Sequence, residues 1–289
     1  MNHLALAAGA WCWHDDYYAG RWSLLDQPDG AAAAGLVAME CNDFMLPAPR
    51  LSRVRQRMLG LLPGAPPELW RYSRANLHRL QNNAQANGVH ILAWAMNSDF
   101  TVACHHWPAQ RLYLHRGMAA ARLLTAPLLR VTLGGSAQTP RSRDALIVRR
   151  LAALVQASPV AVTLENHWGV SADIERHVQI FDTVAASLPT RLQRRFGCCF
   201  DPGNVPEGPQ RPRWWRMLAH RANHFHLKTT SFNAAGDEVH LPYAAIFDLL
   251  AEVGYCSPVT VEYAGQAPPL AGIQQSVHLY HRLVRTPHG

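Results

Sequence analysis

Residues 160–204 read VAVTLENHWGVSADIERHVQIFDTVAASLPTRLQRRFGCCFDPGN. Two apolar runs, 160–169 and 196–204, enclose a helical pattern over 171–188, with Ser171 in the N-cap position. Apolar residues at Ile174, Val178 and Phe181 have the spacing of one helix face. Short apolar strands joined by a helix are typical of parallel strands buried on both faces. The stretch therefore predicts a strand–helix–strand unit.

The same alternation extends in both directions from this unit. A helix is expected over 66–88, beginning with prolines and ending at Gly88, and further strands at 4–11, 35–43, 89–97, 128–135, 224–232 and 258–265. Eight such units in 289 residues predict an α/β protein, a single (β/α)₈ barrel domain spanning 1–289. An open doubly wound sheet is the alternative, but no GxGxxG follows the first strand. The Pro/Gly-rich region at about 43–65 is interpreted as a loop insertion.

Composition limits the classes of function. Hydrophobic residues make up 48% of the chain and charged residues 16%, which indicates a globular protein. The net charge is +7, but the arginines are scattered as singles and pairs, so no nucleic-acid partner is predicted. No apolar stretch approaches the roughly 20 residues of a membrane span, and the N-terminus does not resemble a signal peptide. None of the six cysteines forms a CxxC pair. A soluble, cytoplasmic protein with reduced thiols is expected.

Four polar residues end consecutive expected strands. They are Glu165, Asp201, His226 and Glu262. Active sites of (β/α)₈ barrels form at the carboxyl ends of the strands, so these side chains are expected to converge. Three carboxylates and one imidazole make an oxygen-rich site that suits Mn²⁺, Mg²⁺ or Co²⁺ better than a structural zinc ion. The alternative is four unrelated polar groups that face solvent.

Lys228 is the one lysine among 27 cationic Lys and Arg residues. Strand periodicity places it on the same face as His224 and His226. A lysine ammonium is a compact donor, unlike the bulkier planar guanidinium of arginine. We therefore predict that Lys228 contacts substrate oxygens or balances charge beside the metal. His224 receives no assigned role.

The motifs TLENHWG (163–169), DPGN (201–204), HFHLK (224–228) and VTVEY (259–263), in this order, resemble the xylose-isomerase-like TIM barrel superfamily. This superfamily includes sugar isomerases and epimerases and has the fold of AP endonuclease family 2. The resemblance implies that Glu165, Asp201, His226 and Glu262 are metal ligands. It also implies that Glu165 and Glu262 act as acid and base. The chain departs from the common pattern at Asn204, where many members have histidine, and at Thr229, where many have aspartate.

The resemblance implies a divalent-metal-dependent sugar, cyclitol or keto-sugar isomerase or epimerase. Such an enzyme removes a proton alpha to a carbonyl and stabilises the enediolate. Mn²⁺ and Mg²⁺ are the expected ions, with Co²⁺ and Zn²⁺ as alternatives. The alternative functions are a dehydratase or lyase, an endonuclease IV-like nuclease, and a non-catalytic sugar-binding barrel. A carbohydrate-like small molecule is the expected partner, and a homo-oligomer is compatible with the sequence.

Further substrate-binding candidates lie near the ends of the expected strands. Aromatic faces often line sugar sites, but core packing explains the two tryptophans of this set equally well. Arg130 has a second interpretation, pairing with Glu165 from the next strand. The candidates are His167, Asn204, Trp13, Trp94, Glu40 and Arg130.

Overall fold

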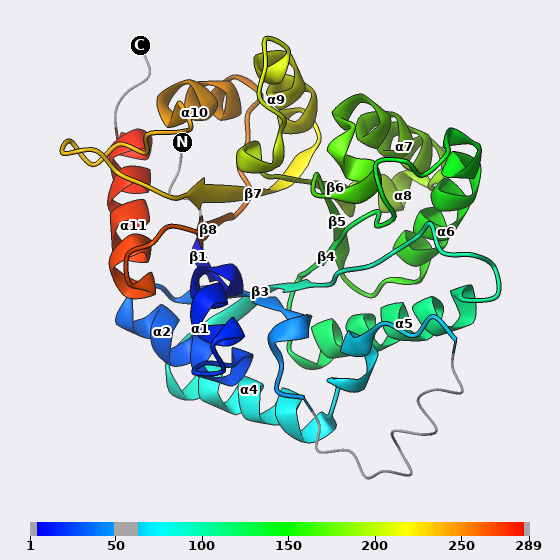
Figure 1. Cartoon of the computed structure of the whole chain (residues 1–289), viewed down its shortest axis with the longest axis horizontal. Coiled ribbons are helices and arrows are strands. Elements are labelled where there is room, and N and C mark those ends of the chain that lie inside the picture. The colour runs from blue at the N-terminus through cyan, green and yellow to red at the C-terminus, as the bar shows by residue number, and fades with distance from the viewer. Residues whose placement is uncertain (1–4, 49–62, 286–289) are drawn as a thin grey trace.

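The computed structural model describes residues 5–48 and 63–285. Eight parallel strands pair in sequence order and close into a barrel, since β8 also pairs with β1 (Figure 1). This confirms the predicted (β/α)₈ fold. The strands are β1 (Leu6–Gly9), β2 (Ala38–Asn42), β3 (His90–Ala95), β4 (Leu128–Val131), β5 (Ala161–Glu165), β6 (Phe196–Phe200), β7 (Ala222–Thr229) and β8 (Val259–Tyr263).

The helices form a ring around the barrel (Figure 1). Their bounds are α1 (His14–Tyr18), α2 (Gln27–Ala33), α4 (Arg74–Ala86), α5 (Trp107–Leu123), α6 (Asp144–Ala157), α7 (Ile174–Ser187), α8 (Thr190–Gln193), α9 (Arg211–Ala219), α10 (Tyr243–Glu252) and α11 (Pro269–Arg285). No helix in the described ranges is both long and apolar enough to cross a membrane. Most of the predicted insertion at about 43–65 falls on 49–62, which lie outside the described residues.

Alternation along β7 separates the polar interior of the barrel from its apolar outer face. In β7, the outward residues Phe225 and Leu227 belong to the core shared with the helices. The intervening His226 faces the interior, where it contacts glutamates from other strands. Ala7 of β1, Ala38 of β2 and Leu92 of β3 form a separate small apolar cluster.

Two expected helix starts are wrong in detail. The helix predicted over 66–88 is divided into a 3₁₀ turn at Pro67–Trp70 and α4, because Ser73 interrupts it. The Ser73 hydroxyl accepts a hydrogen bond from the backbone N–H of Asn76 at 3.0 Å, which is N-cap geometry. In α7 the N-cap is Asp173, whose carboxylate accepts from the Arg176 backbone N–H at 3.0 Å, in place of the expected Ser171.

Candidate metal centre

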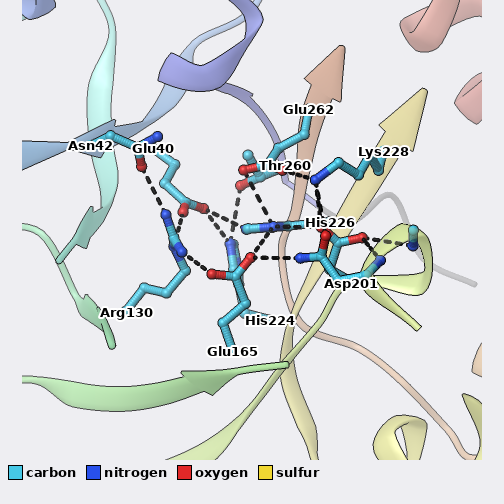
Figure 2. A network of polar contacts seen from close by, with 12 residues as sticks. Glu40, Asn42, Arg130, Glu165, Asp201, His224, His226, Lys228, Thr260 and Glu262 are labelled. Atoms are coloured by element: carbon cyan, nitrogen blue, oxygen red, sulfur yellow. Dashed lines mark hydrogen bonds and ion pairs between the residues drawn. The ribbon is translucent and has the colours of Figure 1, made fainter. Parts of the chain in front are cut away.

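Four strands bring the predicted ligands together at one end of the barrel (Figure 2). Glu165 ends β5, Asp201 directly follows β6, His226 lies in β7 and Glu262 lies in β8. One donor atom from each residue lies within 4.8 Å of the donors of the other three, and all four residues are buried. Parallel strands that close into a barrel account for this convergence, because each contributes the side chain at its carboxyl end.

The imidazole of His226 faces the carboxylates with its Nδ1 atom. Nδ1 lies 3.4 Å from Oε1 of Glu165, 3.4 Å from Oε1 of Glu262 and 3.8 Å from Oδ2 of Asp201. This buried nitrogen has no hydrogen-bond partner among the described residues. A buried polar atom without a partner is costly, and a cation shared with the three carboxylates satisfies it. The donor set fits a divalent ion that prefers oxygen ligands.

The loop after β6 orients Asp201. Its Oδ1 atom accepts hydrogen bonds from the backbone N–H groups of Gly203 at 2.7 Å and Asn204 at 3.3 Å. The side-chain amide of Asn166 donates to the Asp201 carbonyl at 2.8 Å, and its oxygen accepts from the Asp201 backbone N–H at 2.9 Å. Because Oδ1 is committed to the turn, Oδ2 is the atom presented to the site.

Burial and neighbouring charges shift the pKa values of Glu165, Asp201 and His226. Burial raises the pKa of Glu165, but the Arg130 guanidinium and the neighbouring imidazoles together more than offset it, so the pKa of Glu165 falls well below its usual range. Burial likewise raises the pKa of Asp201, but the Lys228 ammonium and the His226 imidazole together lower it below its ordinary value. Burial lowers the pKa of His226, while the surrounding thiol and carboxylates raise it well above its ordinary value. The centre therefore places three buried carboxylates around one imidazole, a donor set that favours a cation.

Lys228 lies at the rim of this cluster. Its Nζ atom is 3.2 Å from Oδ2 of Asp201, 3.4 Å from Oε2 of Glu262 and 3.3 Å from Oδ1 of Asn204. Its side chain is 20% exposed, whereas that of Asp201 is fully buried. The adjacent carboxylates overcome burial and raise its pKa, so the ammonium stays charged. Lys228 is thus more exposed than any of the four predicted ligands.

Arg130 joins two glutamates inside the barrel. Its Nε–H donates to Oε1 of Glu40 at 2.7 Å, one terminal nitrogen donates to Oε2 of Glu165, and the other donates to Oδ1 of Asn42 at 2.8 Å. Glu40 also contacts Nε2 of His224 at 2.6 Å. The structure thus places Arg130 in the pairing position beside Glu165. The His224–Glu40 contact was not anticipated, although His224 shares the periodicity of His226.

The remaining candidates lie in different surroundings. Asn204 reaches the centre, with its amide nitrogen 3.5 Å from Oε1 of Glu165. His167 is half-buried beyond the end of β5. Trp94 faces the helices, is fully buried, and donates its indole N–H to the Tyr72 hydroxyl at 3.0 Å. The ring of Trp13 stacks on that of Trp22, 5.4 Å away. The contacts of Trp94 and Trp13 are those of core packing.

Comparisons with known proteins agree with this geometry. A family model described as xylose isomerase-like TIM barrel matches residues 54–283. A D-allulose 3-epimerase from Methylomonas sp., solved with D-allulose, superimposes with a TM-score of 0.69 at 13% identity, covering 96% of each chain. A xylose isomerase-like TIM barrel protein from Mycobacterium smegmatis, solved with magnesium, gives 0.66 at 15% identity and 97% of each chain.

A probable 3-DHS dehydratase from Bacillus anthracis gives a TM-score of 0.66 at 13% identity, covering 96% of this chain and 100% of that one. No curated protein sequence matches this chain. At these identities the solved structures establish the shared fold, and the family match rests on the sequence model.

Proposed function

Because the chain belongs to the xylose isomerase-like TIM barrel family, we propose that it is a divalent-metal-dependent isomerase or epimerase of a carbohydrate-like substrate. The observation that carries this proposal is the buried cluster of Glu165, Asp201, His226 and Glu262, whose donor atoms lie within 4.8 Å of one another. Neighbouring structures include a D-allulose 3-epimerase with its sugar bound and a family member with magnesium bound, which supports both the substrate class and the metal dependence.

These four residues would hold a divalent ion, whose Lewis acidity would polarise a substrate carbonyl and acidify the adjacent C–H bond. Mn²⁺ or Mg²⁺ suits the three carboxylates best. Glu165 and Glu262 are the acid–base pair, because each carboxylate borders the space in front of His226 Nδ1 at 3.4 Å. One removes the proton from the substrate carbon, and the other returns a proton on epimerisation.

In this proposal, the Lys228 ammonium contacts the substrate. It is partly exposed at 20% while its Nζ atom lies within 3.4 Å of two ligand carboxylates. A fixed ammonium at this point donates hydrogen bonds to substrate oxygens as negative charge develops on them. Asn204 lies beside it, since its side-chain oxygen is 3.3 Å from Nζ.

Deuterium exchange tests the proposed chemistry whatever the product of the reaction is. The Mn²⁺-loaded protein is incubated in D₂O with free ketoses, including D-allulose and D-tagatose, and followed by NMR. We expect deuterium at a carbon next to the carbonyl, and no exchange with Glu165→Gln or Glu262→Gln. Exchange that persists unchanged in both variants would contradict the assigned acid–base roles. Wild-type protein that exchanges no proton of any ketose or cyclitol ketone tested would contradict the isomerase or epimerase proposal.

A dehydratase is the second candidate, because elimination of a β-hydroxyl begins with the same proton abstraction. The similarity to a probable 3-DHS dehydratase, at a TM-score of 0.66, favours keeping it. Mass spectrometry separates the two activities, since dehydration removes one water from the substrate and isomerisation leaves its mass unchanged.

A further inference from the structure

Glu40 approaches the centre from β2 but touches a different side of His226 from the ligand carboxylates. Its Oε2 atom lies 3.2 Å from Nε2 of His226 and 2.6 Å from Nε2 of His224. Its other oxygen accepts from Nε of Arg130 at 2.7 Å. The residue is 1% exposed, so both oxygens are committed to buried partners. Figure 2 shows Glu40 lying between Arg130 and the two imidazoles.

The contact with Glu40 determines where His226 carries its proton when an ion is bound. An ionised carboxylate only accepts hydrogen bonds, so an imidazole nitrogen that bonds to it must carry the hydrogen. A neutral imidazole has one N–H group, and its other nitrogen then offers a lone pair. For His226 the N–H is at Nε2, and the lone pair is at Nδ1, which faces the three carboxylates.

Arg130 completes the arrangement on the carboxylate side. It holds Oε1 of Glu40 and Oε2 of Glu165 at once, which leaves Oε1 of Glu165 facing His226 Nδ1 at 3.4 Å. Arginine suits this task because its planar fork binds two carboxylates in fixed directions. Arg130 is 4% exposed, so its charge is held inside the barrel.

The same cation argues against a second ion deeper in the barrel. Cys199, His224 and His226 also bring donor atoms within 4.8 Å of one another. However, both Nε2 atoms are directed at Glu40, and the Arg130 guanidinium already neutralises that carboxylate. A divalent ion there would compete with a fixed positive charge at close range.

We propose that Glu40 and Arg130 are positioning residues for the metal centre and not substrate contacts. Glu40 holds the His226 proton on Nε2 so that Nδ1 binds the ion, and Arg130 directs one oxygen of Glu165 toward it. This proposal rests on the metal-dependent function proposed above. Partners of this kind orient metal-binding imidazoles, and their loss typically weakens metal affinity about 10–100-fold.

Titration of the metal-free protein with Mn²⁺ by calorimetry tests this assignment with Glu40→Gln. The amide oxygen of the variant still accepts from Arg130, so its NH₂ group faces Nε2 of His226 and moves the imidazole proton to Nδ1. We expect Mn²⁺ affinity to fall about 10–100-fold while the variant stays folded. Thr260→Val is the matched control. It removes a hydroxyl that lies 3.1 Å from Nε2 of His224, and it leaves the contact between Glu40 and His226 in place. Its Mn²⁺ affinity should equal that of the wild type.

The outcomes separate the two proposals. Wild-type protein that binds no Mn²⁺ overturns the metal-dependent function. If the wild type binds Mn²⁺ and Glu40→Gln binds it equally well, the positioning role is overturned, and a raised KM in that variant would instead make Glu40 a substrate contact. ¹⁵N NMR of the Zn²⁺-loaded wild type needs no variant. We expect a protonated Nε2 on His226, and a protonated Nδ1 with Nε2 bound to zinc would also overturn the positioning role.

Discussion

The ammonium nitrogen of Lys228 lies 3.2 Å from Oδ2 of Asp201, a carboxylate oxygen that also faces the imidazole of His226. Its stem passes close to Gly203, where an added Cβ would lie 2.7 Å from Cδ of Lys228. The position therefore suits a slender side chain with a compact charge. This relationship links the single lysine of the chain to the reaction proposed for the site.

Lys228→Arg should lower kcat by roughly 100-fold, the effect of removing one well-placed donor to developing negative charge. The wider guanidinium has little space beside Gly203 and does not reproduce the position of Nζ. Metal content should stay at the wild-type level, because the four ligands are unchanged. Steady-state kinetics with matched metal analysis measures both quantities. Wild-type kcat in Lys228→Arg would show that this lysine has no special role.

Arg130→Met should destabilise the protein by about 3–5 kcal/mol, because it leaves the buried Glu40 and Glu165 without their cation. Urea denaturation measures the free energy of unfolding. Arg213→Met is the control, since it breaks an ion pair with Glu175 in which both side chains are more than half exposed, at 60% and 52%. The control should leave stability almost unchanged. Equal stability of Arg130→Met and wild type would contradict the role given to the buried charge.

Asp43 makes stability depend on pH. It is buried beneath the hydroxyls of Tyr72 and Tyr113, which donate to Oδ2 at 2.7 and 2.5 Å. Burial raises its pKa from 3.8 to about 7, although the two phenols oppose the shift. Between these values the folded protein holds a proton that the unfolded chain has released. The free energy of unfolding should therefore fall as pH rises from about 4 to about 7, by at most roughly 4 kcal/mol.

Asp43→Asn removes this dependence, because its amide oxygen still accepts from both tyrosines but the side chain does not ionise. The variant should be more stable than wild type at about pH 8 and should lose more than half of that advantage at about pH 5. Urea denaturation at the two pH values measures the difference. A stability difference that is the same at both would exclude Asp43 as the titrating group.

Glu262→Gln should lower turnover by roughly 10²–10⁴-fold if this carboxylate moves the substrate proton. Glu252→Gln provides the control, because Glu252 is exposed at the end of α10 and pairs with Arg216 on the surface. The control should retain wild-type turnover. Unchanged turnover in Glu262→Gln would assign the proton transfer to another group.

The convergence of Glu165, Asp201, His226 and Glu262 was predictable because two simple rules determine it. Parallel barrel strands converge at their carboxyl ends, and strand alternation assigns His226 and Lys228 to the same face. The positions of Glu165 and Glu262 then follow from counting along β5 and β8. The strand order predicted from sequence is the order found, from β1 to β8 around the barrel.

The contacts across the barrel interior were not predictable in the same way. The hydrogen bond between His224 and Glu40 joins residues 184 positions apart in the sequence. It depends on which side chains of β2 and β7 lie at the same height along the barrel axis. The direction in which Trp94 points could not be predicted, for a different reason. The run His90–Ala95 is almost uniformly apolar, so no alternation indicates that Ala95 pairs with Arg130 and that Trp94 faces the helices. Packing and burial in the folded barrel decide such positions.

Anomalous diffraction from a crystal soaked in Mn²⁺ tests the central claim most directly, because manganese is located independently of the protein density. We predict one peak bounded by Glu165 Oε1, Asp201 Oδ2, His226 Nδ1 and Glu262 Oε1, the atoms that face one another in the structure. Asp201→Asn crystals soaked in the same way should show a weaker peak or none. The absence of manganese among these four residues in the wild type would contradict the proposed metal centre.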